Sequence, residues 1–327
     1  MPDRDATLAR IRLRHLQCFL AIAQFGNLRR AAQALSITQP AVTKTLNELE
    51  DMLGAALFVR GRKGATLTPE AEVFLPHANA SVAALARAVD GVMGGPGEAP
   101  LRIGMLPTLG PSFMPAVLRR FAAQRPQATL RLHTGRNRQL IEQLRNRELD
   151  IVVGRLSDPD AMLGVTFEHL YAEPIVIALR NSHPLARHGG DVRDALAQIP
   201  AWPLVLPLAG TLIRQLTDGF LERHGVAPGA GAVETLDTAF ARSLVLGGDA
   251  IWFTPLGAAQ PDLEAGLLVR LDARITPEEP VGLMLPADAA PSPALQALLG
   301  ALRQQAAEQR RPAPAPRAAR RRRINRK

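Results

Sequence analysis

Short hydrogen-bonding side chains line one face of a helix that the sequence predicts from residue 39 to residue 53. Gln39, Thr43 and Asn47 recur at intervals of four, with Lys44 beside them, so they share one side of an α-helix. Gln and Asn can bond two atoms of a base edge at once, Thr can bond a base or a phosphate, and Lys favours phosphate. The pattern predicts a helix that enters a DNA groove. An ordinary amphipathic helix with a polar outer face is the alternative.

The opposite side of that helix predicts how it is held in place. Apolar residues spaced four, three and four apart form a seam that should be buried, and they are Val42, Leu46, Leu49 and Leu53. Thr38 can cap the first N–H groups, and Pro40 lies in the first turn, where its missing N–H costs little.

The neighbouring segments favour DNA binding over an ordinary helix. A helix from about residue 12 to residue 25 should be followed by a second one that Asn27 caps, which gives a helix-turn-helix layout. Residues 57–68 then form a hairpin with cations at its tip, and such a wing suits phosphates or the minor groove. The candidate DNA-contacting residues are Asn27, Thr38, Gln39, Pro40, Thr43, Lys44, Asn47, Arg60, Arg62 and Lys63.

A long helix should begin after Thr68. Its apolar residues alternate spacings of three and four and predict pairing with another helix, most simply in a dimer; packing against its own domain is the alternative. These residues are Leu75, Ala78, Val82, Leu85, Val89 and Val92. Pro76 lies inside this helix and should kink or locally break it, because an internal proline costs about 3 kcal/mol. Residues 94–97, GGPG, predict a hinge.

From residue 101 onwards, strands alternate with helices, which predicts two α/β lobes with a cleft between them. Threonines, glycines and arginines recur where the predicted strands end, and such groups suit a small anion such as a carboxylate. Each fragment alone is also the composition of an ordinary turn. The candidate ligand-contacting residues are Thr108, Thr134, Arg136, Arg155, Thr211 and Thr254.

The composition argues against several other classes of protein. Cys18 is the only cysteine, so there is no intramolecular disulfide framework, and the scattered histidines lack metal-ligand spacing. We therefore expect no catalytic residue, no metal and no cofactor, and a packing role for Cys18. No apolar run approaches the ~20 residues that span a bilayer, and residues 1–16 lack the apolar core of a secretory signal. A cytoplasmic protein without membrane contact is expected.

Positive charge gathers at the two ends of the chain. The net charge of +9 divides into an excess of cations in residues 1–64, an excess of acids in residues 65–309, and eight Arg with one Lys and no acid in residues 310–327. Basic ends suggest contact with a polyanion. The tail from residue 310 should be disordered, since it has too little apolar surface to fold; it could add nonspecific affinity for DNA or only improve solubility.

Taken in order, these segments resemble the LysR-type transcriptional regulators over about residues 12–309. The resemblance is carried by HLQCFLAIAQFGNLRRAAQALSITQPAVTKTLNELEDMLGAALFVR, followed by the wing and TPEA, and by the later PIVIALRNSHPLA. The spelling QPAVTKTL is most similar to regulators of protocatechuate and related aromatic or sugar catabolism.

The resemblance implies an α+β multidomain protein. Residues 12–68 would form a winged helix-turn-helix, residues 69–97 a dimerising linker helix with its hinge, and residues 98–309 a two-lobed α/β effector domain like the periplasmic binding proteins. The implied partners are promoter DNA, a small inducer, RNA polymerase and further copies of the chain, in dimers and tetramers. An α/β enzyme or a small-molecule binding protein with accessory helices is the rival interpretation.

Overall fold

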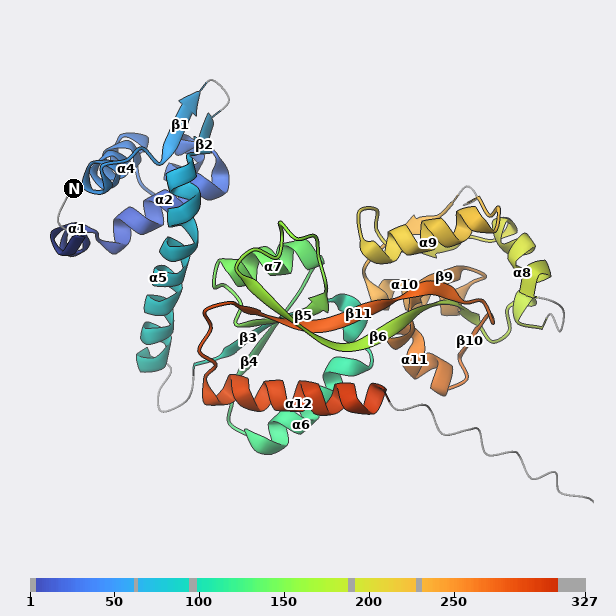
Figure 1. Ribbon diagram of the computed structural model, residues 1–327. Helices are drawn as coiled ribbons and strands as arrows, with labels where there is room; N and C mark the ends of the chain where they lie inside the picture. The colour runs from blue at the N-terminus through green and yellow to red at the C-terminus, as the bar shows by residue number, and fades with distance from the viewer. Residues whose placement is uncertain (1–3, 62–63, 94–98, 188–191, 228–230, 311–327) are drawn as a thin grey trace, which may run out of the picture. The chain divides into compact units, whose positions relative to one another are not determined.

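The computed structural model describes residues 4–61, 64–93, 99–187, 192–227 and 231–310 (Figure 1). The chain divides into two compact units. The first comprises Met1–Leu106, Gln127–Phe167 and Met284–Ala294, and the second comprises Pro107–Pro126, Glu168–Leu283 and Leu295–Lys327. None of the helices within the described residues is long and apolar enough to cross a membrane.

The amino-terminal part of the first unit has the helices and the hairpin that the sequence predicts. Its elements are α1 (Arg4–Arg10), α2 (Leu13–Phe25), α3 (Leu28–Ala34), α4 (Gln39–Leu53), β1 (Phe58–Gly61), β2 (Gly64–Leu67) and α5 (Pro69–Met93). The two strands pair antiparallel, with Arg60 opposite Ala65. Helix α1 was not expected, because its seven residues are too few to show a period.

The helix boundaries follow from the capping residues. Gly26 ends α2 with a φ of 60°, a left-handed conformation that glycine adopts without strain. The side chain of Asn27 accepts hydrogen bonds from the N–H groups of Arg29 and Arg30 at the start of α3, and Thr38 accepts one from Ala41 at the start of α4. The predicted caps are confirmed.

The predicted seam of α4 lies in the core of this part. Val42, Leu46 and Leu49 are fully buried, and they pack with residues of α2, α3 and β1. The ring of Phe19 lies 5.5 Å from the ring of Phe58 and 5.2 Å from that of Phe74, between centroids. The wing and the start of α5 therefore share one apolar core with the three helices, which fixes the outer face of α4.

Helix α5 is continuous through Pro76, so the expected local break does not occur. Ala71 and Ala78 are buried on either side of Pro76, which is itself exposed. Packing of these two residues on the core holds both flanking turns, and this offsets the lost hydrogen bond of the proline. The second half of α5 exposes Leu85, Val89 and Val92.

The rest of the first unit contains a parallel sheet, as predicted. It is built from β3 (Leu101–Met105), β4 (Leu130–Thr134) and β5 (Ile151–Arg155), with the helix α7 (Asn137–Arg145). Strand β3 pairs in parallel with both β4 and β5. Two longer strands, β6 (Val165–Arg180) and β11 (Ile275–Pro286), contribute residues to both units.

The second unit has a mixed sheet covered by helices. Strand β7 pairs in parallel with β8 and β9, whereas β6 pairs antiparallel with β9 and β10. Its strands are β7 (Leu204–Leu206), β8 (Val233–Glu234), β9 (Ile251–Pro255) and β10 (Leu268–Arg270). Its helices are η1 (Pro107–Leu109), α6 (Phe113–Gln124), η2 (Pro184–Arg187), α8 (Val192–Gln198), η3 (Ile199–Ala201), α9 (Leu212–Arg223), α10 (Thr238–Gly247), α11 (Leu256–Glu264) and α12 (Pro293–Gln309).

Helices α6 and α12 lie side by side in this unit, joined by a hydrogen bond from Arg120 to Gln305 and an ion pair between Arg120 and Glu308 (Figure 1). Helix α11 was not predicted, because Gly257 and Pro261 obscure its helical pattern. Strand β6 begins at Val165; its first half includes exposed and half-buried residues, whereas most of its second half is buried.

Candidate functional site

The outer face of α4 is an open surface. It is lined by Gln39, Pro40, Thr43, Lys44, Asn47, Glu48 and Asp51. This surface contains all the predicted DNA-contacting residues of α4. The capping residues Asn27 and Thr38 and the residues of the wing are not part of it. The Thr43 hydroxyl donates a hydrogen bond to the Gln39 carbonyl at 3.1 Å, which directs its remaining lone pairs outwards. Side chains with both donors and acceptors on a rigid helix can read base edges.

The capping residues have structural work as well. Asn27 Oδ1 lies 2.8 Å from the Arg29 nitrogen, and Thr38 Oγ1 lies 3.4 Å from the Ala41 nitrogen. These bonds hold the ends of α3 and α4, whatever part the two side chains play on DNA. Arg60 lies on β1, while Arg62 and Lys63 lie outside the described residues.

The single cysteine helps to hold α4 from behind. Cys18 is buried, and its thiol donates a hydrogen bond to the Val42 carbonyl, with 3.4 Å between the sulfur and the oxygen. Burial raises the pKa of the Cys18 thiol to about 11. Because the thiolate is the reactive form, this residue acts as a packing residue rather than a nucleophile, as the sequence suggested.

A charged contact at the open face of α4 was not predicted from the sequence. Glu48 Oε2 lies 3.2 Å from Nε2 of His15, which is buried, and 3.4 Å from Nη2 of Arg14. The hydrogen bond with His15, together with the nearby charges of Arg14 and Lys44, holds the pKa of the Glu48 carboxyl below its usual range. The two partners are 33 residues apart, so no local pattern could have paired them.

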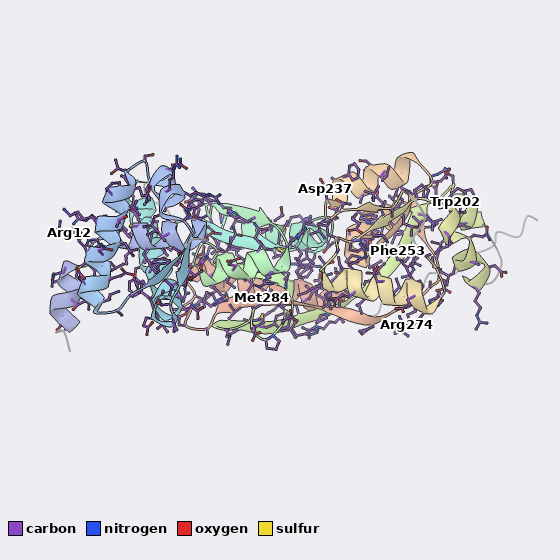
Figure 2. All side chains as sticks on the ribbon, turned by 90° about the horizontal axis from the view of Figure 1, so that it is seen from above. Arg12, Trp202, Asp237, Phe253, Arg274 and Met284 are labelled. Atoms are coloured by element: carbon purple, nitrogen blue, oxygen red, sulfur yellow. The ribbon has the colours of Figure 1, made fainter. Side chains whose placement is uncertain are left out.

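A second candidate site is a pocket within the second unit. Its lining residues are Thr108, Pro207, Ile213, Thr235, Leu236, Asp237, Thr238, Ala241, Trp252, Phe253, Thr254 and Pro255. Phe253 lies inside the unit and Asp237 at its surface (Figure 2). The pocket contains two of the predicted residues, Thr108 and Thr254, both buried. Its aromatic and carboxylate lining was missed, since these residues come from strands and loops far apart in the sequence.

Two helices, α9 and α10, begin at this pocket, and the residue before each of them caps its first N–H groups. Thr211 caps α9 by accepting from the Arg214 N–H, and Asp237 caps α10 by accepting from Ala239 and Phe240. Among the described residues lining the pocket there is no Lys or Arg. An anion held there would have to rely on hydroxyls and on the partial positive charge of a helix start.

Three of the other predicted ligand contacts lie in the first unit. Arg155 is buried at the end of β5, where its backbone exchanges hydrogen bonds of 3.1 and 2.7 Å with the Asn137 side chain. Thr134, the last residue of β4, and Arg136, the residue before α7, are both exposed. Their role in holding a ligand, like that of Thr211, stays a prediction. The described residues contain no group of His, Cys, Asp and Glu side chains that could hold a metal ion.

The chain matches known proteins along nearly its whole length. Residues 13–72 match the family described as bacterial regulatory helix-turn-helix protein, lysR family, and residues 94–307 match the LysR substrate binding domain. The chain is 39% identical over 302 residues to the HTH-type transcriptional regulator PcaQ of Agrobacterium fabrum, covering 91% of this chain and 96% of that protein. It is 38% identical over 297 residues to the uncharacterized HTH-type transcriptional regulator YdcI of Escherichia coli, covering 90% and 95%.

A solved structure shows the same fold. A full-length OxyR variant from Pseudomonas aeruginosa superposes with a TM-score of 0.58 at 23% identity, covering 89% of this chain and 97% of the other.

Proposed function

This chain belongs to the LysR family of transcriptional regulators, and from that premise we propose which of its residues contact promoter DNA and which hold the effector. The helix-turn-helix binds DNA and the substrate-binding domain binds an effector, as in the family. The domain limits that we propose are those expected from the sequence, with DNA binding in residues 12–68, the linker in 69–97 and effector binding in 98–309.

The open face of α4 supports the DNA-binding part of the proposal. Gln39, Thr43 and Asn47 read base edges in the major groove, and Lys44 contacts phosphate. These residues line one open surface of a helix whose opposite face is fully buried, so the helix has no other face to offer. Arg60, Arg62 and Lys63 of the wing contact the neighbouring DNA backbone or minor groove. Asn27, Thr38 and Pro40 determine how closely the starts of α3 and α4 approach the DNA.

The pocket of the second unit carries the effector part. A small carboxylate binds near the hydroxyls of Thr108 and Thr254, and its apolar portion packs on Trp252 and Phe253. Thr211 stabilises the start of α9. Thr134, Arg136 and Arg155, which lie in the first unit, are proposed as effector contacts in their own right. We also propose that the protein belongs, as the sequence suggested, to the subgroup of regulators that control protocatechuate and related aromatic or sugar catabolism.

The remaining parts of the proposal concern assembly and place. The exposed apolar residues of α5 pair two subunits, and dimers associate into tetramers on two-part promoter sites. Binding of the effector shifts the balance between tetramer shapes, because the ligand binds those shapes unequally. The regulator acts in the cytoplasm, contacts RNA polymerase at the promoter and catalyses no reaction.

The DNA assignment is tested by replacing Gln39 or Thr43 with alanine. Each change should weaken discrimination at particular operator positions by about 1–3 kcal/mol while the protein stays folded. Binding would be measured against an operator series with every base pair substituted in turn. Unaltered preference at every position in both variants would rule out α4 as the reading helix.

A further inference from the structure

The carboxylate of Glu48 lies among the polar side chains on the open face of α4. Glu48 lines the same open surface as Gln39, Thr43 and Lys44, and its side chain is 36% exposed. DNA phosphates repel a carboxylate, so a fixed negative charge on a DNA-facing helix weakens binding unless it meets a hydrogen-bond donor.

The carboxylate is held in one direction by a buried histidine. His15 Nε2 lies 3.2 Å from Glu48 Oε2, and the side chain of His15 is only 3% exposed. The other ring nitrogen, Nδ1, accepts the Arg12 backbone N–H at 3.0 Å. Arg14 Nε also lies 3.4 Å from His15 Nε2, but the shorter bond from the Arg12 N–H makes Nδ1 the acceptor. A neutral imidazole that accepts at Nδ1 carries its proton on Nε2, so the ring donates to Glu48. The first turn of α2, where Figure 2 labels Arg12, thus orients a side chain of α4.

Neighbouring cations keep this carboxylate ionised. Arg14 lies 3.4 Å from Glu48, and Lys44 is one helical turn away on the same face of α4. The pKa of Glu48 is lowered by the His15 hydrogen bond and by these two charges. An ionised carboxylate only accepts hydrogen bonds.

The major groove offers few donors to such an acceptor. The exocyclic amines of cytosine and adenine are donors there, whereas guanine and thymine present acceptors. We propose that Glu48 accepts a hydrogen bond from the exocyclic amine of a cytosine or adenine in the operator, and that His15 is the positioning residue that aims it. This rests on the proposed function, in which α4 lies in the major groove.

The test compares full-length variants on an operator series in which each base pair is changed in turn. The unaltered protein should prefer an amine-bearing base at one position of each half-site by roughly tenfold. Glu48→Ala should remove that preference and leave the other positions unchanged. Glu48→Gln keeps the shape but adds a donor, so it should tolerate guanine or thymine at that position. Replacing the base by an analogue without the amine, purine for adenine or 2-pyrimidinone for cytosine, identifies which base is read.

His15 is tested by two replacements that imitate one ring nitrogen each. Asparagine in His15→Asn can still accept the Arg12 N–H but is too short to reach Glu48, so the preference at this position should be lost with the fold retained. Glutamine in His15→Gln can donate from the Nε2 position and should restore it. The charge-matched control for Glu48→Gln is Glu72→Gln, which removes an exposed charge from the first turn of α5.

The outcomes separate this proposal from the one on which it rests. If Glu48→Ala and Glu48→Gln weaken all operators equally, or lower only the melting temperature, Glu48 is an interhelical tie and the proposal is overturned. If Gln39→Ala and Thr43→Ala also leave every position unchanged, the assignment of α4 to the major groove fails as well.

Discussion

Replacing Leu85 and Val89 by glutamate should separate the subunits while leaving each one folded. These side chains are 45% and 46% exposed in the single chain, so the monomer depends little on them. Full burial of such a side chain contributes about 1.5–3 kcal/mol, so the half that is still exposed is worth about 1 kcal/mol. Four such side chains in a symmetric dimer contribute about 4 kcal/mol, which corresponds to roughly a thousandfold in the dissociation constant.

The assay is sedimentation equilibrium of the full chain, with circular dichroism as the check on folding. Val73→Glu is the matched control, because Val73 is 69% exposed on the same helix but lies off the predicted seam. The double variant should sediment as a smaller species across the micromolar range, and the control should not. An unchanged mass for the double variant, or equal dissociation of the control, would refute pairing through this face of α5.

Three further predictions concern single side chains. Burial lowers the pKa of His183, so the unfolded state binds more protons than the folded state below pH about 6.5, and the free energy of unfolding should fall there by at most about 1.4 kcal/mol per pH unit. In denaturant titrations, His183→Gln should reduce the slope of this free energy against pH, whereas the exposed-site control His133→Gln should not. Equal slopes for the two variants would contradict the reasoning. The Cys18 thiol should react with a thiol reagent only after denaturation, since its pKa is raised to about 11; rapid labelling of the native protein would contradict its burial. In a thermal-shift screen of small carboxylates, Thr108→Val should weaken a ligand by about 1–3 kcal/mol, through loss of one hydroxyl, without altering DNA binding, and an unchanged ligand affinity would remove Thr108 from the site.

Local patterns in the sequence were sufficient for the helices and strands that carry the proposed functions. The seam of α4 and the cap at Thr38 are both confirmed, because helical spacing and capping act within a few residues. The continuity of α5 at Pro76 was not predictable in this way, since it depends on packing of Ala71 and Ala78 against other helices.

The sites were less accessible to sequence reasoning than the elements. Thr108 and Thr254 were identified as strand-end residues, and the structure places both in one pocket, but Asp237 and Trp252 had no signal of their own. The contact between His15 and Glu48 joins two helices, so it follows only from the tertiary fold. The role of the basic tail lies outside the described residues and stays a prediction.

The most direct test of DNA reading by α4 is to sequence the genomic fragments that the purified full-length protein retains at about 150 mM salt, where nonspecific phosphate contacts are screened. One enriched motif with two-fold symmetry is expected for the unaltered protein, and the Gln39→Ala and Thr43→Ala variants should each lose preference at single positions of that motif. Salt-sensitive retention of fragments that share no motif would contradict it.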